Sequence, residues 1–282
     1  MTIKKLIINF RTGSPLRLFV FAVIGLIFAS ETIHAQTKTG DGFLWEYAKD
    51  HTSVYITGYI GNSSKLRIPS YIEKMPVKAI SGFAGNVNIV SVEIPETVIE
   101  LKTQSLYLGA FTHCTALKSV SGPIGNALPK SLQRIGAYAF AGCTALEAIT
   151  LGDQITYIGP QAFSDCTALT KINLPSELKK INWAAFARCT ALAEIVIPEG
   201  LVEISYMTFS DCTALQKITL PVSLRHIGPQ AFENCTALVE VVIQNEDIQF
   251  HDYGKGIFAG CTSLPPPNRT EIADIGYTGS FD

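Results

Sequence analysis

Apolar residues recur in this chain with two alternating spacings, and the stretch from Cys166 to Arg188 shows both most fully. Ile172 and Leu174 are two residues apart with polar residues between and before them, which predicts a short strand, and Pro175 ends it. Further along, Ile181 and the pair Ala185-Phe186 suit a short helical or 3₁₀ turn that returns the chain to the next strand. One such unit therefore predicts one coil with one strand.

The same unit repeats along most of the sequence. The tetrapeptide Cys-Thr-Ala-Leu begins at Cys114, Cys143, Cys166, Cys189, Cys212 and Cys235, and Cys-Thr-Ser-Leu begins at Cys261. From Cys143 to Cys235 the step is 23 residues each time. A fixed period of this length predicts an α/β repeat solenoid of leucine-rich 23-residue units, with one short parallel strand per coil.

The register extends beyond the cysteines and divides the chain into segments. Asn86 stands in the cysteine position of an earlier coil, and residues 66–264 are predicted to form the solenoid. Residues 43–47 and 54–59 flank a polar turn, so residues 36–65 predict a β-hairpin cap. The prolines at 265–267 end the pattern, and residues 265–282 are expected to be a loose polar tail. Extra residues near 103–109, 124–129 and 245–256 predict loops, which in solenoids often carry function.

The N-terminus has the layout of a secretory signal peptide. Four basic residues precede the apolar run 18–29, and Ala35 closes a short polar stretch, so cleavage is expected after residue 35. The run is short for a membrane span, which leaves an uncleaved anchor as the alternative. We expect a secreted or cell-surface protein without an integral membrane segment in its mature chain.

Charge and motifs narrow the possible chemistry. The chain has 22 basic and 24 acidic residues, a formal net charge of -2, and no basic cluster, which argues against a nucleic-acid partner. Motifs for nucleophilic catalysis, metallopeptidases or nucleotide binding do not occur, and neither does a short-spaced Cys/His set for zinc. The sequence therefore predicts neither an enzyme nor a bound cofactor.

The seven cysteines all occupy one position of the repeat and should stack in a column. Neighbouring coils are close enough for disulfides, but side chains of equivalent residues run parallel, and seven is an odd number. We therefore expect buried free thiols that act as small core residues, with a disulfide framework as the alternative.

Two surfaces are candidates for binding a protein partner. The outward strand positions Lys171, Glu194, Lys217 and Glu240 alternate in sign, which is also what a solvated, self-neutralising strand face would show. Two residues after the second framework isoleucine, successive coils carry Ala137, Pro160, Trp183, Tyr206 and Pro229, with Tyr138 and Met207 one residue on. Aromatic and Met side chains are typical interface anchors, although they could instead pack locally over the corner.

The run F-x-x-C-T-A-L-x-x-I-x-L-P-x-x-L-x-x-I-G-x-x-A-F, with Ile56-Thr57-Gly58-Tyr59 and Ile68-Pro69 before it, resembles the BspA-like class of bacterial leucine-rich repeats over roughly residues 54–264. The resemblance implies an exported or surface-exposed protein that adheres to host or extracellular proteins, and it implies no catalytic motif. A structural spacer or assembly module without a host ligand is the alternative.

Overall fold

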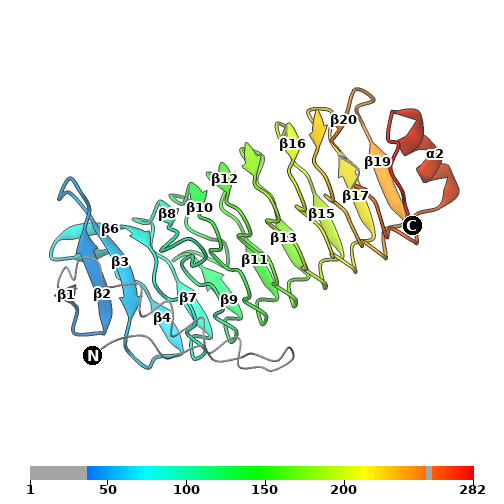
Figure 1. Ribbon diagram of the computed structural model, residues 1–282. Helices are drawn as coiled ribbons and strands as arrows, with labels where there is room; N and C mark the ends of the chain where they lie inside the picture. The colour runs from blue at the N-terminus through cyan, green and yellow to red at the C-terminus, as the bar shows by residue number, and fades with distance from the viewer. Residues whose placement is uncertain (1–36, 252–255) are drawn as a thin grey trace, which may run out of the picture. The chain divides into compact units, whose positions relative to one another are not determined.

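The computed structural model describes residues 37–251 and 256–282, which form one solenoid of stacked coils (Figure 1). Each coil holds two short strands, so the prediction of one strand per coil was wrong. The first strand of each coil, which follows the cysteine in the coils that have one, belongs to the set β4 Lys65–Arg67, β7 Ser91–Glu93, β9 Ser119–Ser121, β11 Ala148–Thr150, β13 Lys171–Asn173, β15 Glu194–Val196, β17 Lys217–Leu220 and β19 Glu240–Ile243.

The second strand of each coil is centred on the later framework isoleucine. These strands are β6 Met75–Ile80, β8 Glu100–Leu101, β10 Arg134–Ile135, β12 Tyr157–Ile158, β14 Lys180–Ile181, β16 Glu203–Ile204, β18 His226–Ile227 and β20 Gln249–Phe250. Within each set the paired strands of successive coils run parallel, as Ile195 with Ile218 and Ile204 with Ile227 illustrate, and the pairing is interrupted between β9 and β11, between β13 and β15 and between β14 and β16. Most second strands have two residues, too few to show the alternation by which a strand is found in a sequence.

The return segment of each coil is a series of turns, whereas we expected a short helical or 3₁₀ turn. Two positions in it adopt left-handed backbone angles, for example Ala184 at φ 52° and Arg188 at φ 60°. A residue with positive φ interrupts a right-handed helix or 3₁₀ helix, so the segment cannot wind into one. Within the described residues the helix is α2, Pro266–Asp274, and the α/β label therefore does not describe the coils.

A column of stacked phenylalanines fills the core. Consecutive rings from Phe111 to Phe258 lie with their centroids 5.2–5.6 Å apart and their planes nearly parallel. The framework leucines and isoleucines surround this column, and the whole set forms one apolar cluster. Because each coil adds one ring and one set of aliphatic side chains, each coil buries its apolar face only against its neighbours.

The two ends of the solenoid differ from the coils between them. At the N-terminal end β1 (Thr37–Lys38) pairs with β2 (Phe43–Tyr47), and β2 pairs with β3 (Val54–Tyr59) as the antiparallel hairpin that we predicted. β3 in turn pairs in parallel with β6, and β5 (Tyr71–Ile72) forms a second hairpin with β6. Whether the first hairpin serves as a cap stays a prediction.

At the C-terminal end the segment that we expected to be loose contains α2. Ile272 and Tyr277 are buried, and the Tyr277 ring meets Phe258 edge-on at 5.3 Å. The expected signal peptide lies outside the described residues. In the part of the chain that the structure describes, no helix is long and apolar enough to cross a membrane.

Candidate protein-binding surface

The charged strand positions lie where the sequence predicted. Lys171, Glu194 and Lys217 are exposed and Glu240 is half-buried, and Lys217 pairs in register with Glu194 and Glu240. Of these four described residues, Lys217 and Glu240 form the one ion pair, at 2.8 Å between Nζ and Oε1. Since both side chains are about half exposed, the pair contributes little, on the order of 0.2–1 kcal/mol.

A second charged column lies on the second strands, and our sequence reading missed it. Arg134 contacts Glu100 at 3.5 Å on one side, and its guanidinium lies 4.0 Å from the centre of the Tyr157 ring on the other. The sequence could have predicted this column, because Glu100, Arg134 and Tyr157 each immediately precede a framework Ile or Leu. Both columns mix positive and negative side chains, so neither presents a strong field of one sign.

We call Trp183 and Tyr206, with the neighbouring candidates Tyr138 and Met207, the aromatic corner. Hydrogen bonds between coils hold the backbone beneath Trp183 and Tyr206. The amide of Gln161 donates to the carbonyl of Trp183, and the amide of Ala184 donates to the carbonyl of Tyr206 at 2.8 Å. These bonds between coils fix the main chain, while the Trp183 and Tyr206 side chains remain 39% and 41% exposed. Two large aromatic side chains therefore stand on neighbouring coils above a rigid base.

The other two predicted corner residues are less accessible. Met207 is half-buried and Tyr138 is buried, so Tyr138 offers little surface to a partner, and its role in binding stays a prediction. The Tyr138 ring is covered by Tyr107, with the ring centroids 5.9 Å apart and the planes at 72°. Burial, assisted by the neighbouring Tyr107, raises the pKa of Tyr138.

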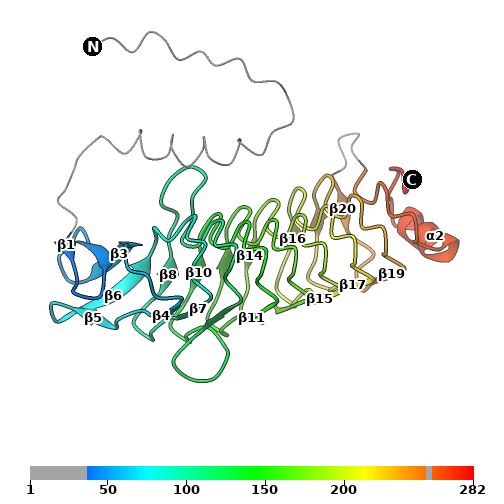
Figure 2. The same cartoon turned by 90° about the horizontal axis from the view of Figure 1, so that it is seen from below.

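The insertions expose apolar side chains that the sequence reading did not single out. Leu106 and Tyr107 in the first insertion are 84% and 70% exposed, and Ile124 in the second is 80% exposed. Figure 2 shows two loops in the green part of the chain that leave opposite sides of the solenoid. The first insertion lies next to the aromatic corner, since Tyr107 packs on Tyr138 and Thr103 donates a hydrogen bond to the carbonyl of Ala137.

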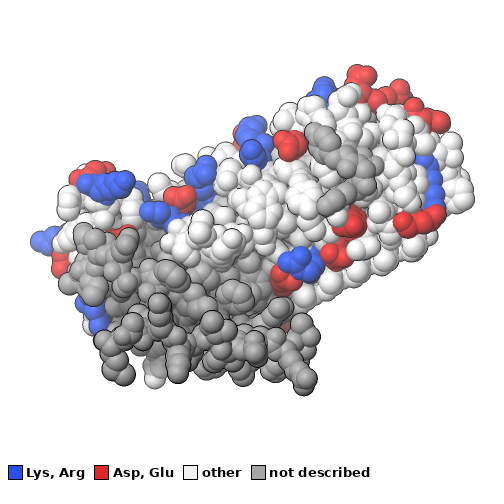
Figure 3. Space-filling model, viewed as in Figure 1, with Lys and Arg blue, Asp and Glu red and all other residues white. Residues whose placement is uncertain are grey.

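Part of the visible surface carries no charged side chains. Where the described residues are visible in Figure 3, the Lys, Arg, Asp and Glu side chains lie mainly along the margins, and an area between them is uncharged. An uncharged area of this kind suits contacts made by aromatic and aliphatic side chains.

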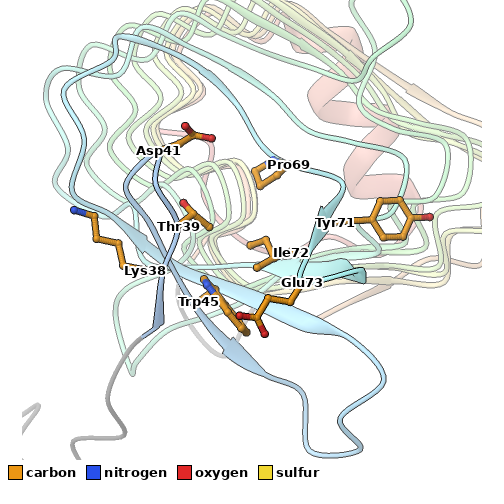
Figure 4. A pocket seen from close by; sticks show the side chains of 8 residues that line it. All are labelled: Lys38, Thr39, Asp41, Trp45, Pro69, Tyr71, Ile72 and Glu73. Atoms are coloured by element: carbon orange, nitrogen blue, oxygen red, sulfur yellow. The ribbon is translucent and has the colours of Figure 1, made fainter.

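Two shallow cavities lie at the N-terminal end. The first, of about 330 Å³, is shown in Figure 4, where Trp45, Ile72 and Glu73 lie close together and Lys38 and Tyr71 lie on opposite sides. The second, of about 580 Å³, is lined by Arg67, Glu93 and Glu96 together with prolines. Among the described residues no group of three His, Cys, Asp or Glu side chains lies close enough together to hold a metal ion.

The cysteine column is buried within the coils. Each Sγ donates to the carbonyl of the phenylalanine one coil earlier, as Cys189 does to Phe163 at 3.1 Å. Burial raises the pKa of Cys114 and of Cys212 to about 12. These thiols are protonated at neutral pH and cannot act as nucleophiles there, since the thiolate is the reactive form.

Comparison with known proteins agrees with this geometry. The family model described as "BspA type Leucine rich repeat region" matches in 6 copies, over residues 79–212, 109–239 and 180–274. A solved T. pallidum leucine-rich repeat protein, TpLRR, is 26% identical with a TM-score of 0.66, and the alignment covers 87% of this chain and 99% of that one. A leucine-rich repeat protein from Bacteroides ovatus is 20% identical over 80% of each chain, with a TM-score of 0.44.

No curated protein resembles the chain closely enough to count as a match. The matched ranges of the family model run together from residue 79 to residue 274, which is more than half of the 282 residues. The period, the stacked coils and this match lead to one conclusion: the chain belongs to the BspA-type leucine-rich repeat family.

Proposed function

We propose that this protein is exported and binds another protein, an extracellular or host protein, through the aromatic corner of its solenoid. The observation that carries the proposal is the exposure of Trp183 and Tyr206 on adjacent coils. Trp and Tyr are the residues most enriched among those that dominate binding energy, since each buries a large apolar area when a partner covers it.

The rigidity of the corner supports this role. Because the backbone beneath Trp183 and Tyr206 is fixed by hydrogen bonds between coils, a partner does not have to order it on binding. The first insertion packs on Tyr138, two coils before Trp183, and exposes the further apolar side chains Leu106 and Tyr107. Contact area, and not charge attraction, is therefore the expected source of affinity.

The proposed location rests on the N-terminal leader. The basic residues, the apolar run 18–29 and the small residue at 35 favour export and cleavage. Fractionating cells into membrane, periplasm and medium, and sequencing the N-terminus of the recovered protein, tests this part. A chain that begins at Gln36 is expected, and retention of Met1 on a membrane would contradict cleavage.

The binding proposal is tested with the double variant W183A/Y206A against a panel of purified extracellular matrix proteins, by surface plasmon resonance. We expect affinity for the captured partner to fall about 30-fold or more, because loss of an interface anchor costs about 2 kcal/mol. The melting temperature should change little, since both side chains are more than a third exposed.

The matched control is V202A/V222A, which removes two apolar side chains that are 51% and 56% exposed elsewhere on the coils. This variant should bind as the unaltered protein does. A large drop in melting temperature for W183A/Y206A would instead make the two aromatics structural. Self-association without capture of any matrix protein would favour the spacer or assembly role.

A further inference from the structure

Two of the five histidines of the chain meet on neighbouring coils near the C-terminal end. His226 is in β18, and His251 follows β20 directly. The Nδ1 atom of His226 lies 3.1 Å from the Nε2 atom of His251, and the ring centroids are 5.2 Å apart. His226 occupies the same strand position as Glu100 and Arg134 in the second charged column, and His251 lies outside the charged columns and the aromatic corner.

The repeat explains how the two rings can meet. His251 occupies the position directly after the framework residue of the second strand, where preceding coils carry Gly136, Gly159, Asn182, Ser205 and Gly228. The coil immediately before His251 has Gly228 there, so no side chain separates the His251 ring from His226. A large side chain at this position is a departure from the repeat, and its ring reaches the other histidine.

The backbone beneath both histidines is fixed. The amide of His251 donates to the carbonyl of Ile227 at 2.9 Å, and the amide of His226 donates to the carbonyl of Val202 at 3.1 Å. The strands pair in register, with His226 opposite Gln249 and Ile227 opposite Phe250. The two side chains therefore stand on a preformed base, which lowers the entropic cost of bringing them together on a ligand.

We propose that His226 and His251 form a two-histidine site for a divalent transition-metal ion. Two imidazole nitrogens that each bind one ion at about 2.0–2.1 Å, and that lie 3.1 Å apart, subtend an angle of about 95–102° at the ion. This angle lies between the square-planar and tetrahedral values, so small side-chain rotations fit Cu²⁺, Ni²⁺ or Zn²⁺. Neutral imidazole is the form that binds these metals.

Two charged side chains near His226 make hydrogen bonds to other groups. Glu203 is the register partner of His226 on the preceding coil, but its Oε1 atom accepts a hydrogen bond from Ser205 at 2.8 Å. The guanidinium of Arg225 donates to the carbonyls of Val222 and Leu224. Among the described residues no third His, Cys, Asp or Glu side chain joins the two histidines. A site with two protein ligands has moderate affinity and should follow the order Cu²⁺ above Ni²⁺ and Zn²⁺.

The test is calorimetric titration of the purified full-length protein, without a histidine tag, with CuCl₂, NiCl₂ and ZnCl₂ at pH 7.5. We expect one ion per chain, bound most tightly for Cu²⁺. The variants H226Q and H251Q should each weaken Cu²⁺ binding about tenfold or more. The control H51N changes an exposed histidine at the other end of the chain, whose φ of 55° Asn tolerates, and should bind as before.

A second readout does not depend on any variant. The electron paramagnetic resonance spectrum of the 1:1 Cu²⁺ complex should show coupling to two imidazole nitrogens. Coupling to one nitrogen or none would overturn the proposal, as would unchanged Cu²⁺ affinity in the double variant H226Q/H251Q. Unaltered circular dichroism of the variants would show that any loss of binding comes from the missing ligands.

Discussion

Single residues in the return turns take backbone conformations that their side chains do not favour. Asp165, Arg188 and Asp211 precede the cysteines of successive coils with φ near 60°, where other coils have Gly142 or Gly260. An L-residue in this region costs about 1 kcal/mol relative to glycine. Arg188 partly offsets this cost, because its Nε and Nη2 atoms bond both carboxylate oxygens of Asp165 at 2.6 and 2.7 Å.

The opposing effects at Arg188 lead to a prediction about two substitutions. R188A loses the ion pair and keeps the strained backbone, so it should lower the free energy of unfolding by about 0.5–1 kcal/mol. R188G loses the same pair but relieves the strain, so it should be about 1 kcal/mol more stable than R188A. Urea unfolding of both variants checks this, and equal stabilities would show that the left-handed conformation costs nothing here.

The pKa of Asp165 is set by the same contacts. Burial by itself would raise the pKa of this carboxyl, but the hydrogen bonds and charge of Arg188 outweigh burial and lower it. A lowered pKa means that the pair contributes stability at neutral pH and loses it on acidification.

At the scale of the repeated element, the cysteine column links each coil to the coil before it. From Phe111 to Phe232, each phenylalanine carbonyl in the column accepts the amide of its own coil's cysteine and the Sγ of the next coil's cysteine, as Phe186 does from Cys189 and Cys212. Cysteine thus supplies a small apolar side chain with one weak donor, and the fixed repeat keeps that donor next to an acceptor. This arrangement explains why one residue type recurs in the column.

The buried thiols predict a dependence of stability on pH. Burial raises the pKa of Cys212 from its ordinary value of 9.0 to about 12, so the folded thiol stays protonated while the unfolded thiol ionises above pH 9. Stability is therefore fully present below pH 9 and falls as the pH rises through the range between 9 and 12, by up to about 1.4 kcal/mol per pH unit for each such thiol. Urea unfolding at pH 7.5, 9.5 and 10.5 measures the loss.

Counting thiols provides the direct test of their redox state. All seven cysteines should react with a thiol reagent after denaturation without reductant, and they should react slowly in the folded protein. Two or fewer reactive thiols in the denatured chain would establish a disulfide framework in place of the free column.

At the scale of the whole molecule, a solenoid must protect its two ends, because the terminal coils lack a neighbour on one side. Phe43 and Tyr59 lie against Phe83 at the N-terminal end of the phenylalanine column. At the other end Tyr277 and Phe281 cover Phe258. The Asn268 side chain also bonds both the amide and the carbonyl of Val241, in β19, as a further strand would.

Removing residues 265–282 should therefore expose the last coil. We expect a lower melting temperature and concentration-dependent self-association, since the Phe258 ring and the main chain of β19 become available to another molecule. Size-exclusion chromatography with light scattering measures the association. The control D274A removes an exposed α2 side chain and should remain like the unaltered protein, and a monomeric truncated chain with unchanged melting temperature would contradict a capping role.

The sequence by itself determined the solenoid, its period and the buried framework. A repeat of 23 residues with apolar residues at fixed places requires equivalent residues to stack, so the positions of Phe186, Cys189 and Ile195 in the core follow without coordinates. The outward direction of Lys171 and Lys217 follows in the same way from the period of a strand.

Only the tertiary structure decided the features that depend on contacts between coils. The second strands have few residues and are defined by pairing with their neighbours, and the left-handed turns result from closing each coil at a fixed length. The covering of Tyr138 by Tyr107, the docking of Ile272 and the approach of His226 to His251 all join residues from different coils or segments. Local sequence patterns report the period of one element, whereas these contacts depend on how neighbouring coils are aligned.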